Sequence, residues 1–454
     1  MTEKLEMLFE NLLHFFEERK FSELKEALID VEPMDIASFM ENNLDDKEQI
    51  LFFRIIPKDI ASSVFVELDA DVKEDLIRAF SDKELEAVIS DMFLDDTVDV
   101  IEEMPANVVK RILKASDAES RKTINELLKY PEDSAGSIMT TEYVSFSASL
   151  TVEEAFERIR KVGPNKETIY TCYVTDGRKK LIGVVSVKEL LLSPKDALIK
   201  DIMDENVITV ATHEDKEQVA LKLSKYDFLA LPVIDKEGCI VGIVTVDDAV
   251  DVIQEEATED IHKMAAILPT EKPYFKQSIF SVWKARIPWL MLLLIASTFT
   301  SMILSHYEER LSVVLTAFVP MLMGAAGNAG GQTSVTVIRS IAIGEVEFKD
   351  ILRVILKELI VGALVGLSVA LVCFLKILLI DNLYNEINIQ TNLVISGVCA
   401  LSIIMAKLVG CILPLFAKKL KLDPAVVASP LMTTIVDVLS LVIYCTLAIA
   451  FLGL

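Results

Sequence analysis

A single carboxylate interrupts the last long apolar stretch of the chain. Asp437 is the only charged residue in Pro424–Leu454, and it lies about 20 Å from the start of this stretch if the stretch is helical. Thr433, Thr434 and Ser440 are four and three residues before it and three residues after it, so a helix would carry them on the same face. Hydroxyls beside a carboxylate suit a hard, hydrated cation. We therefore expect these four side chains to line an ion pathway, with Asp437 binding the metal.

The alternative for Asp437 is a structural role. An acidic side chain at membrane depth is costly unless it faces water, an ion or a partner, and intramembrane acids are most often functional. A neighbouring helix could instead bond Asp437 without any ion, and Lys407 in the preceding apolar stretch is a candidate partner. The sequence assigns Lys407 no other role.

A second polar set lies in the segment PMLMGAAGNAGGQTS (320–334). Asn328 and Gln332 are four residues apart, so a helix would present both amides on one face. The surrounding glycines allow either close contact between helices or a local break that exposes carbonyl groups to a water-filled cavity. Packing alone would explain the glycines, but it explains the two amides less well. We expect Asn328 and Gln332 to be pore-lining residues.

Five apolar stretches are long enough to cross a bilayer, which takes about 20 helical residues. They cover Ile287–Leu304, Leu311–Ile338, Leu359–Ile380, Thr391–Ala417 and Pro424–Leu454. Lys and Arg concentrate in the second and fourth connections, and positively charged loops stay in the cytoplasm. This pattern predicts a multi-pass protein of the cell (inner) membrane, with a cytoplasmic N-terminus and an extracellular or periplasmic C-terminus. The N-terminal residues also lack the basic and apolar pattern of a signal peptide, so we expect the first 270 residues to be cytoplasmic.

Charge divides the chain into two parts. The chain has 45 Lys and Arg against 69 Asp and Glu; residues 271–454 hold 14 and 11 of these, which leaves 31 against 58 and a net charge of −27 in residues 1–270. Such an acidic part repels nucleic acid and attracts cations, although solubility is the simpler explanation of the composition alone. The six cysteines form no CxxC motif, which indicates reduced thiols rather than disulfides or a zinc site.

Residues 137–257 contain an internal repeat. Its copies run from SIMTTEYVSF to LIGVVSVKELL and from DIMDENVITV to IVGIVTVDDAVDV, and each predicts a strand, a helix, two strands and a final helix. Paired units of this length resemble a tandem of CBS domains. In that family a Ser/Thr-x-x-Asp pattern after the last strand can hold the ribose of an adenine nucleotide. Thr245 and Asp248 match this pattern, whereas Ser186 and Glu189 match it loosely, so ATP is a candidate ligand of the tandem.

Residues 1–130 predict short amphipathic helices throughout. The segments PMDIA (33–37) and PKDIA (57–61) recur 24 residues apart, and helix-pair repeats of this kind stack into a superhelical solenoid. Asp95, Asp96 and Asp99 form an acidic group that we expect to be exposed, with no adjacent Lys or Arg.

The segment that joins the two parts is strongly acidic. No Lys or Arg occurs from Glu237 to His262. As a helix, the segment has an apolar face made of Val250, Ile253, Ala257, Ile261 and Met264, and an acidic face made of Asp248, Asp251, Glu255 and Glu259. Like charges at these spacings repel each other, so solvation, basic partners or cations must offset the repulsion. Because the helix leads to the first span and ends near Pro269 and Pro273, we favour a cation-sensing face beside a pore entrance.

The chain resembles the MgtE family of magnesium transporters over essentially its whole length. The order of the parts matches, and so do the motifs VTVDDAVDVIQEEATEDIHKMAA, PMLMGAAGNAGGQ and DPAVVASPLMTTIVDV. The resemblance implies a homodimer with the ion path on the dimer axis between the second and fifth spans, and it makes Asp437 the carboxylate of the pore site. It also implies regulatory magnesium sites that join the helical domain, the CBS tandem and the connecting, or plug, helix. The positions that fit these sites are Asp95, Asp96, Asp99, Glu217, Asp227, Asp248, Asp251, Glu256, Glu259 and Asp260.

We therefore expect a multidomain fold. It comprises an all-α superhelical domain at 1–131, an α/β CBS tandem at 132–257, a connecting helix at 248–272 and a five-span α-helical pore domain at 283–454. The expected function is a magnesium-selective channel or transporter that admits Mg²⁺ and closes when Mg²⁺ binds its cytoplasmic domains. A carrier for cobalt, manganese or calcium and a membrane-anchored nucleotide sensor are the alternatives. An enzyme is not expected, because the sequence has no phosphate-binding loop, no HExxH and no nucleophile with its base.

Overall fold

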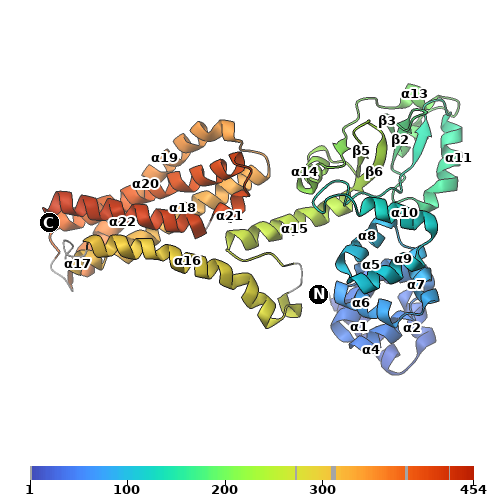
Figure 1. Cartoon of the computed structure of the whole chain (residues 1–454), viewed down its shortest axis with the longest axis horizontal. Helices are drawn as coiled ribbons and strands as arrows, with labels where there is room; N and C mark the ends of the chain where they lie inside the picture. The colour runs from blue at the N-terminus through green and yellow to red at the C-terminus, as the bar shows by residue number, and fades with distance from the viewer. Residues whose placement is uncertain (1–2, 271–273, 308–312, 384–386, 429, 454) are drawn as a thin grey trace. The chain divides into compact units, whose positions relative to one another are not determined.

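The computed structural model describes residues 3–270, 274–307, 313–383, 387–428 and 430–453. The chain divides into two compact units, 1–253 and 254–454 (Figure 1). Within the described residues, the first unit begins with ten helices and continues with two small sheets, and the second unit holds the long apolar helices. Each of the six cysteines is a free thiol, as the sequence predicts.

The helical prediction for residues 1–130 is confirmed. The helices are α1 (Glu3–Glu17), α2 (Phe21–Leu28), α3 (Pro33–Asn43), α4 (Asp46–Phe53), α5 (Lys58–Glu67), α6 (Ala70–Ala79), α7 (Asp82–Ser90), α8 (Leu94–Glu103), α9 (Ala106–Ala115) and α10 (Ala118–Leu127). Alternate helices pack on one another: α3 on α5, α5 on α7 and α7 on α9, and likewise α4 on α6, α6 on α8 and α8 on α10. This stacking of helix pairs forms the expected superhelical array.

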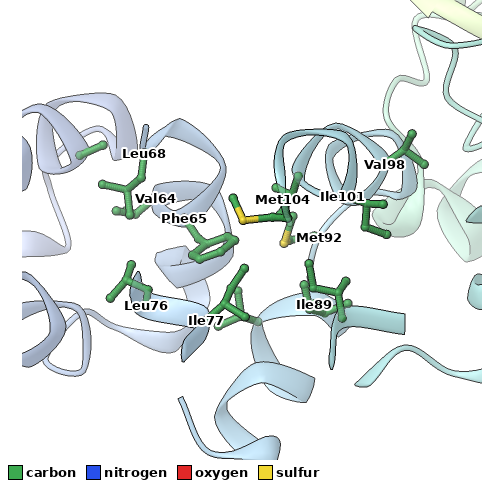
Figure 2. Close-up of a cluster of buried hydrophobic side chains, with 14 of the residues drawn as sticks. Val64, Phe65, Leu68, Leu76, Ile77, Ile89, Met92, Val98, Ile101 and Met104 are labelled. Carbon is green, nitrogen blue, oxygen red and sulfur yellow. The ribbon is translucent and has the colours of Figure 1, made fainter. Parts of the chain in front are cut away.

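An apolar core runs through this array. Figure 2 shows the part where Phe65 of α5, Leu76 and Ile77 of α6, Ile89 of α7 and Met104 after α8 gather. Phe65, Leu76 and Ile77 are fully buried. Apolar residues at spacings of three and four direct one face of each short helix inward. Full burial of each such side chain stabilises the fold by about 1.5–3 kcal/mol.

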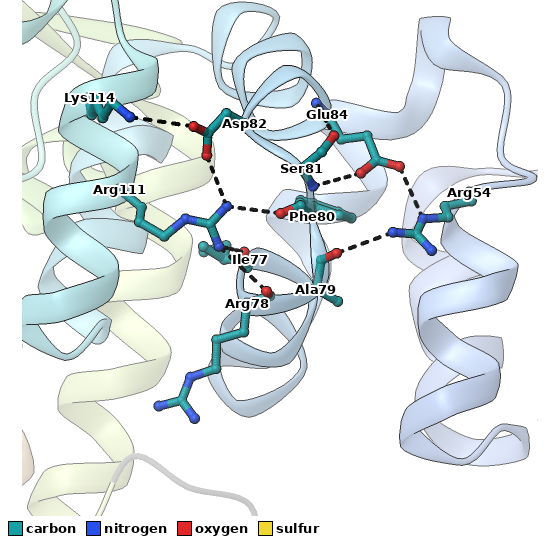
Figure 3. A network of polar contacts seen from close by, with 10 residues as sticks. All are labelled: Arg54, Ile77, Arg78, Ala79, Phe80, Ser81, Asp82, Glu84, Arg111 and Lys114. Carbon is teal, nitrogen blue, oxygen red and sulfur yellow. Dashed lines mark hydrogen bonds and ion pairs between the residues drawn. The ribbon is translucent and has the colours of Figure 1, made fainter.

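Two arginines satisfy the carbonyl groups at the C-terminal end of α6. The last carbonyl groups of a helix have no partner within the helix. Arg111 of α9 donates hydrogen bonds to the carbonyl oxygens of Ile77 at 2.6 Å and Phe80 at 2.9 Å (Figure 3). Arg54, directly after α4, donates to the carbonyl oxygen of Ala79 at 3.2 Å. These bonds fix neighbouring turns of the array to one another.

The internal repeat forms two α/β domains with the same topology. One sheet contains β1 (Ser145–Ser147), β2 (Thr171–Thr175) and β3 (Leu181–Ser186), and the other contains β4 (Val210–Ala211), β5 (Ala230–Ile234) and β6 (Ile240–Thr245). In each sheet the first strand is parallel to the second, which is antiparallel to the third. The helices are α11 (Val152–Val162), α12 (Val187–Leu192), α13 (Ile199–Ile202) and α14 (Lys216–Tyr226). The predicted order of strands and helices is confirmed in both copies.

The two α/β domains exchange their first segments. Met203, at the start of the second copy, packs on Gly183 of the first, where a Cβ atom would lie 2.7 Å from the methionine sulfur. Met139 of the first copy packs in the same way on Gly242 of the second, again at 2.7 Å from an added Cβ. Only glycine permits so close an approach. The positions that match in the repeat are therefore the reciprocal contacts between its copies.

Helix α15 (Val246–Met264) connects the last strand to the membrane part. It ends at Met264, earlier than the sequence prediction near Pro269, and Pro273 lies outside the described residues. On its apolar face, Val250 and Ile261 are exposed in the single chain.

Among the residues that the structure describes, five helical segments are long and apolar enough to cross a membrane, as predicted. They contain α16 (Ile279–Tyr307), α17 (Val313–Thr316) with α18 (Val319–Ala342), α19 (Ile351–Leu379), α20 (Ile389–Lys419) and α22 (Pro430–Leu452), and the short α21 (Pro424–Ala428) precedes the last of them. Helix α20 packs against α18, α19 and α22.

The glycine-rich segment of α18 forms a close helix contact and not a break. The helix is continuous from Val319 to Ala342. A Cβ atom at Gly410 of α20 would lie 2.5 Å from the carbonyl oxygen of Gly330, so the two backbones touch at this point. Of the two explanations that the sequence left open for these glycines, close packing is the one that the structure shows at Gly330.

Candidate functional site

A pocket of about 770 Å³ lies between α18 and α22. Its polar lining includes Asn328, Gln332 and Thr336 from α18, and Thr433 and Asp437 from α22. The four-residue spacing places the three α18 side chains on one face, and the same spacing places the two α22 side chains together. A carboxylate surrounded by amides and hydroxyls can hydrogen-bond the water shell of a hard cation. The pocket is therefore a candidate cation site at membrane depth.

The structure brings most of the predicted pore residues together, with two exceptions. Thr434 is not among the residues that line the pocket. Ser440 is 1% exposed and packs within the helix bundle, although it was expected to share the face of Asp437. Thr336, which the sequence analysis missed, continues the stripe of Asn328 and Gln332 by one more helical turn. That four-residue spacing is the signal that could have found it.

Lys407 does not bond Asp437. Its ammonium group lies 3.5 Å from the carboxylate of Glu358 and 3.0 Å from the hydroxyl of Thr333. Lys407 is thus bonded to one residue of α18 and one of α19, and neither of these residues lines the pocket.

In the first unit, carboxyl groups from α8 and α15 have raised pKa values. Burial and then repulsion from neighbouring carboxylates raise the pKa of Asp95 to about 7 and that of Asp99 to about 8, although Asp99 keeps an exposed surface. Burial is also the main cause that raises the pKa of Asp248 to about 7 and that of Asp96 to about 6. Asp95 adds to the shift of Asp248, which shows that α8 and the first turn of α15 bring like charges together.

Two further acids belong to this group, and the sequence analysis missed both. Burial, followed by repulsion from Asp95, raises the pKa of Glu167 to about 8. Burial raises the pKa of Glu142, whose carboxylate accepts a hydrogen bond from the backbone N–H of Leu94 at 3.2 Å. We call the six side chains the acidic cluster; they are Asp95, Asp96, Asp99, Glu142, Glu167 and Asp248.

The surroundings of the cluster differ from the prediction. Asp95 and Asp96 are half-buried and not exposed. Lys73, from α6, lies near enough to lower the pKa of Asp96, so one basic side chain does approach the group. It pairs with Glu103 at 3.5 Å, so one basic side chain stands against six carboxyl groups.

The cluster fits a hydrated cation better than a dehydrated one. Among the described side chains, Asp95 Oδ1 is buried without a hydrogen-bond partner. Among the same residues, no three His, Cys, Asp or Glu side chains are arranged to hold one metal ion directly. Mg²⁺ keeps several of its waters and commonly binds through one or two carboxylates. Several neighbouring carboxyl groups and an unpartnered oxygen are therefore compatible with an ion that is held through its waters.

Glu217 and Asp227, two of the predicted regulatory ligands, lie at opposite ends of α14. Glu217 is in the first turn, and Asp227 follows the last turn with a left-handed backbone conformation (φ 54°). Ten residues of helix separate them by about 15 Å. The two side chains therefore do not belong to one ion site within a single chain.

The far end of α15 carries a second acidic group. Lys263 bonds the carboxylates of Glu259 at 2.8 Å and Asp423 at 2.7 Å. Burial and then repulsion from Asp423 raise the pKa of Asp260. Asp423, which the sequence analysis did not select, joins α15 to the segment before α21. Of the other predicted ligands on this helix, Asp251 lies in its first half and Glu256 just past its middle.

The predicted nucleotide contacts lie at the start of α15. Thr245 is buried, and its hydroxyl donates a hydrogen bond to the carboxylate of Asp248. Asp248 also belongs to the acidic cluster. A nucleotide and a cation would therefore use the same carboxylate.

An array of short helices, two α/β domains and five long apolar helices, two of which line a polar pocket, are the parts of a multi-span membrane transport protein. Family models match all of these parts: a divalent cation transporter domain of the MgtE type at residues 319–447, an MgtE intracellular N domain at 31–133, and CBS domains at 135–195 and 199–255. The chain belongs to the MgtE family of magnesium transporters, which are not enzymes.

Similar proteins extend along the whole chain. A magnesium transporter of Thermus thermophilus is 35% identical over 454 residues, which cover 99% of this chain and 98% of that protein. A magnesium transporter of Bacillus subtilis is 31% identical and covers 95% of both. The solved cytosolic domain of the Mg²⁺ channel MgtE in complex with ATP is 32% identical, with a TM-score of 0.52; the match covers 54% of this chain and 99% of that one.

Proposed function

We propose that this chain is a magnesium-selective channel or transporter that admits Mg²⁺ through the pocket between α18 and α22. The observation that carries the proposal is the meeting of Asp437, Asn328 and Gln332 at membrane depth. A hexahydrated ion needs about 180 Å³ at ~30 Å³ per water, so the pocket of about 770 Å³ accommodates it without removal of its water shell. A potential of 100 mV, negative inside, drives each divalent ion inward by about 4.6 kcal/mol.

The working unit is a homodimer, with one Asp437 from each subunit beside the ion path. Asn328 and Gln332 are exposed in the single chain, and in a bilayer that exposure would place two amides in lipid. Polar side chains at membrane depth face the bundle interior or a water-filled cavity. A second copy facing α18 and α22 would supply such a cavity, and it would also cover the exposed apolar face of α15. An odd number of spans then places the C-terminus outside the cell.

The pore closes when Mg²⁺ binds the cytoplasmic part. At low internal Mg²⁺ the carboxylates within the acidic cluster repel one another, and so do those at the end of α15. This repulsion opposes a compact arrangement of the cytoplasmic part. Bound Mg²⁺ removes this repulsion and favours the closed form. A shift of the open-to-closed ratio from 99:1 to 1:99 requires about 5.5 kcal/mol of differential binding, which several weak sites can supply together.

The gating part is tested with two charge-matched variants of the full chain in proteoliposomes. The first combines Asp95→Asn, Asp99→Asn and Asp248→Asn; the second combines Glu10→Gln, Glu23→Gln and Glu26→Gln on exposed positions of α1 and α2. The first should raise the internal Mg²⁺ concentration needed for half-inhibition of uptake at least fivefold, and the second should leave it unchanged. Equal responses of the two variants would refute a specific role of the cluster.

ATP is a second ligand that we propose for the CBS domains. The solved relative carries ATP in its cytosolic domain, and Thr245 and Asp248 have the residue types that bind a ribose. If they hold ATP, Thr245→Val weakens ATP binding at least tenfold and leaves Mg²⁺ uptake at low internal Mg²⁺ unchanged. Unaltered ATP affinity in this variant would remove Thr245 from the nucleotide site.

Two alternatives give different measurements. A broader divalent carrier would transport cobalt, manganese or calcium at rates comparable with magnesium, and competition between these ions in the uptake assay separates the two. A membrane-anchored nucleotide sensor would show no ion flux and no effect of Asp437→Ala. The polar pocket within the spans supports the transporter over the sensor.

A further inference from the structure

Three polar side chains from three different spans meet inside the helix bundle. The ammonium group of Lys407 in α20 lies 3.0 Å from the hydroxyl oxygen of Thr333 in α18 and 3.5 Å from the carboxylate of Glu358 in α19. The Thr333 hydroxyl accepts the bond from Lys407 and donates its own hydrogen to Glu358 at 2.9 Å. Thr333 is 2% exposed and Lys407 is 5% exposed, so the group is largely closed to solvent and lipid. We call these three residues the buried triad.

The buried triad does not line the pocket. None of its members is among the residues that surround the pocket between α18 and α22. Thr333 nevertheless follows Gln332 directly in α18, and successive helical residues point about 100° apart. The triad therefore bonds a buried side of α18 that does not line the pocket.

Helix α18 has two distinct faces at this level. Gln332 and Val335 face the pocket, and Val335 is 49% exposed. Thr333 and Ser334 face the bundle, and Ser334 is 1% exposed. A rotation of α18 about its axis would carry the pocket side chains toward the bundle and the bundle side chains toward the pocket.

The glycine contacts fix the distance between the helices, and directional bonds restrain the rotation of α18 further. At Gly330 and Gly410 the backbones of α18 and α20 touch, and a Cβ atom at Gly362 of α19 would lie 3.4 Å from Cδ of Lys407. The hydrophobic effect itself is non-directional. Hydrogen bonds weaken steeply away from a linear arrangement, and a buried charge without its partner is strongly unfavourable. The triad is thus a directional contact that holds this turn of α18.

We propose that Thr333, Glu358 and Lys407 are positioning residues that set the rotation of α18, so that its amide side chains face the ion pathway. The proposal rests on the pocket being the ion pathway, as proposed above. In this proposal Lys407 helps to orient α18 and does not contact the ion.

Cysteine accessibility in the full chain tests the proposal without relying on ion flux. In a variant whose six native cysteines are replaced by alanine, one reporter is introduced at a time, Val335→Cys on the pocket face or Ser334→Cys on the bundle face. The rate of reaction with a charged methanethiosulfonate is measured in proteoliposomes. With the triad intact, Val335→Cys should react at least tenfold faster than Ser334→Cys.

Changes in the neighbouring helices should alter this ratio. Lys407→Met and Glu358→Gln, which leave α18 itself unaltered, should each reduce the ratio at least threefold. Thr333→Val, which keeps the shape and removes the hydroxyl, should do the same, and Thr333→Ser should retain the original ratio. If Lys407→Met does not fold, the pair of Thr333 variants decides the outcome.

Unchanged ratios in folded Lys407→Met and Thr333→Val would overturn the proposal, and so would a loss of Mg²⁺ uptake without a change of ratio. If the ratio shifts as expected while Asp437→Ala retains full uptake, the positioning role stands and the assignment of the pocket as the ion pathway fails.

Discussion

Lys263 and Asp423 form an ion pair of 2.7 Å that joins the end of α15 to the segment before α21. The two residues are 160 positions apart in the sequence. Burial opposes the charge on Lys263, but its hydrogen bonds to Asp423 and Glu259 raise its pKa, so it remains protonated. Asp260 lies beside this pair with a raised pKa. The contact attaches the connecting helix to the membrane domain where the proposed gate must act.

Loss of this contact should weaken closure of the pore. Asp423→Asn removes the ion pair and one of the carboxylates available to Mg²⁺, so we expect the internal Mg²⁺ concentration for half-inhibition of uptake to rise at least threefold. The matched control is Asp381→Asn, which breaks an ion pair with Lys376 of 2.9 Å at the opposite end of the spans. If Asp423→Asn keeps the original concentration for half-inhibition, as the control should, this ion pair has no part in closure.

Because of the acidic cluster, we expect the free energy of unfolding of the first unit to fall as pH rises. The native pKa values of Asp95 and Asp99 are about 7 and about 8, against an ordinary value of 3.8. The native state therefore binds more protons than the unfolded state between about pH 4 and pH 8, and the free energy of unfolding decreases with increasing pH across this window. Without divalent ions, hydrogen exchange at α8, corrected for its intrinsic pH dependence, should show less protection at pH 8 than at pH 5.5. In Asp95→Asn with Asp99→Asn this dependence should become flatter, and an equally steep dependence would contradict the assignment.

Magnesium binding to the same cluster should release protons. The carboxyl groups with raised pKa values must ionise before they attract the cation, so Mg²⁺ affinity should increase at least fivefold between pH 6 and pH 8. Titration calorimetry in two buffers with different ionisation enthalpies measures the number of protons released at pH 6.5. We expect a clear release in the unaltered chain and a smaller one in Asp95→Asn with Asp99→Asn. A binding enthalpy that is the same in both buffers would show that no protons are released, and so that the ions bind outside the cluster.

The contact between α18 and α20 predicts different effects of two similar substitutions. Gly410→Ala places a methyl group 2.5 Å from the carbonyl oxygen of Gly330, so the helices must separate. Overpacking of this kind costs about 1–3 kcal/mol, and we expect a lower Tm and reduced uptake. Gly397→Ala, in the same helix with no atom within 4 Å of the added carbon, is the control and should leave both unchanged. Equal melting temperatures of the two variants would show that the helices accommodate the methyl group.

The sequence predicted those features that depend on local spacing. The repeat predicted the same order of strands and helices in two copies, and the structure shows this order in both. Five spans followed from the lengths of the apolar stretches. The two amides four residues apart and the carboxylate with its preceding threonine were found from helical periodicity, and the structure places them on one pocket.

Contacts between helices could not be predicted from such spacing. Periodicity indicates which face of a helix is polar, but it does not show which helices are neighbours. Lys407 was left without a role because its partner Glu358 lies 49 positions earlier, on another span. Glu167 was missed for the same reason, because only the tertiary fold brings it to the acidic cluster. Ser440 was misplaced because a residue three positions after Asp437 lies toward the packed side of α22.

The most direct test of the central claim is Mg²⁺ uptake into proteoliposomes under an inside-negative potential, with the unaltered chain and Asp437→Ala compared at low and millimolar internal Mg²⁺. We expect rapid uptake by the unaltered chain at low internal Mg²⁺, strong inhibition at millimolar internal Mg²⁺, and at least a tenfold loss of uptake in Asp437→Ala. No uptake by the unaltered chain, or uptake that is the same with and without the Asp437 carboxylate, would contradict the assignment of this pocket as the ion pathway.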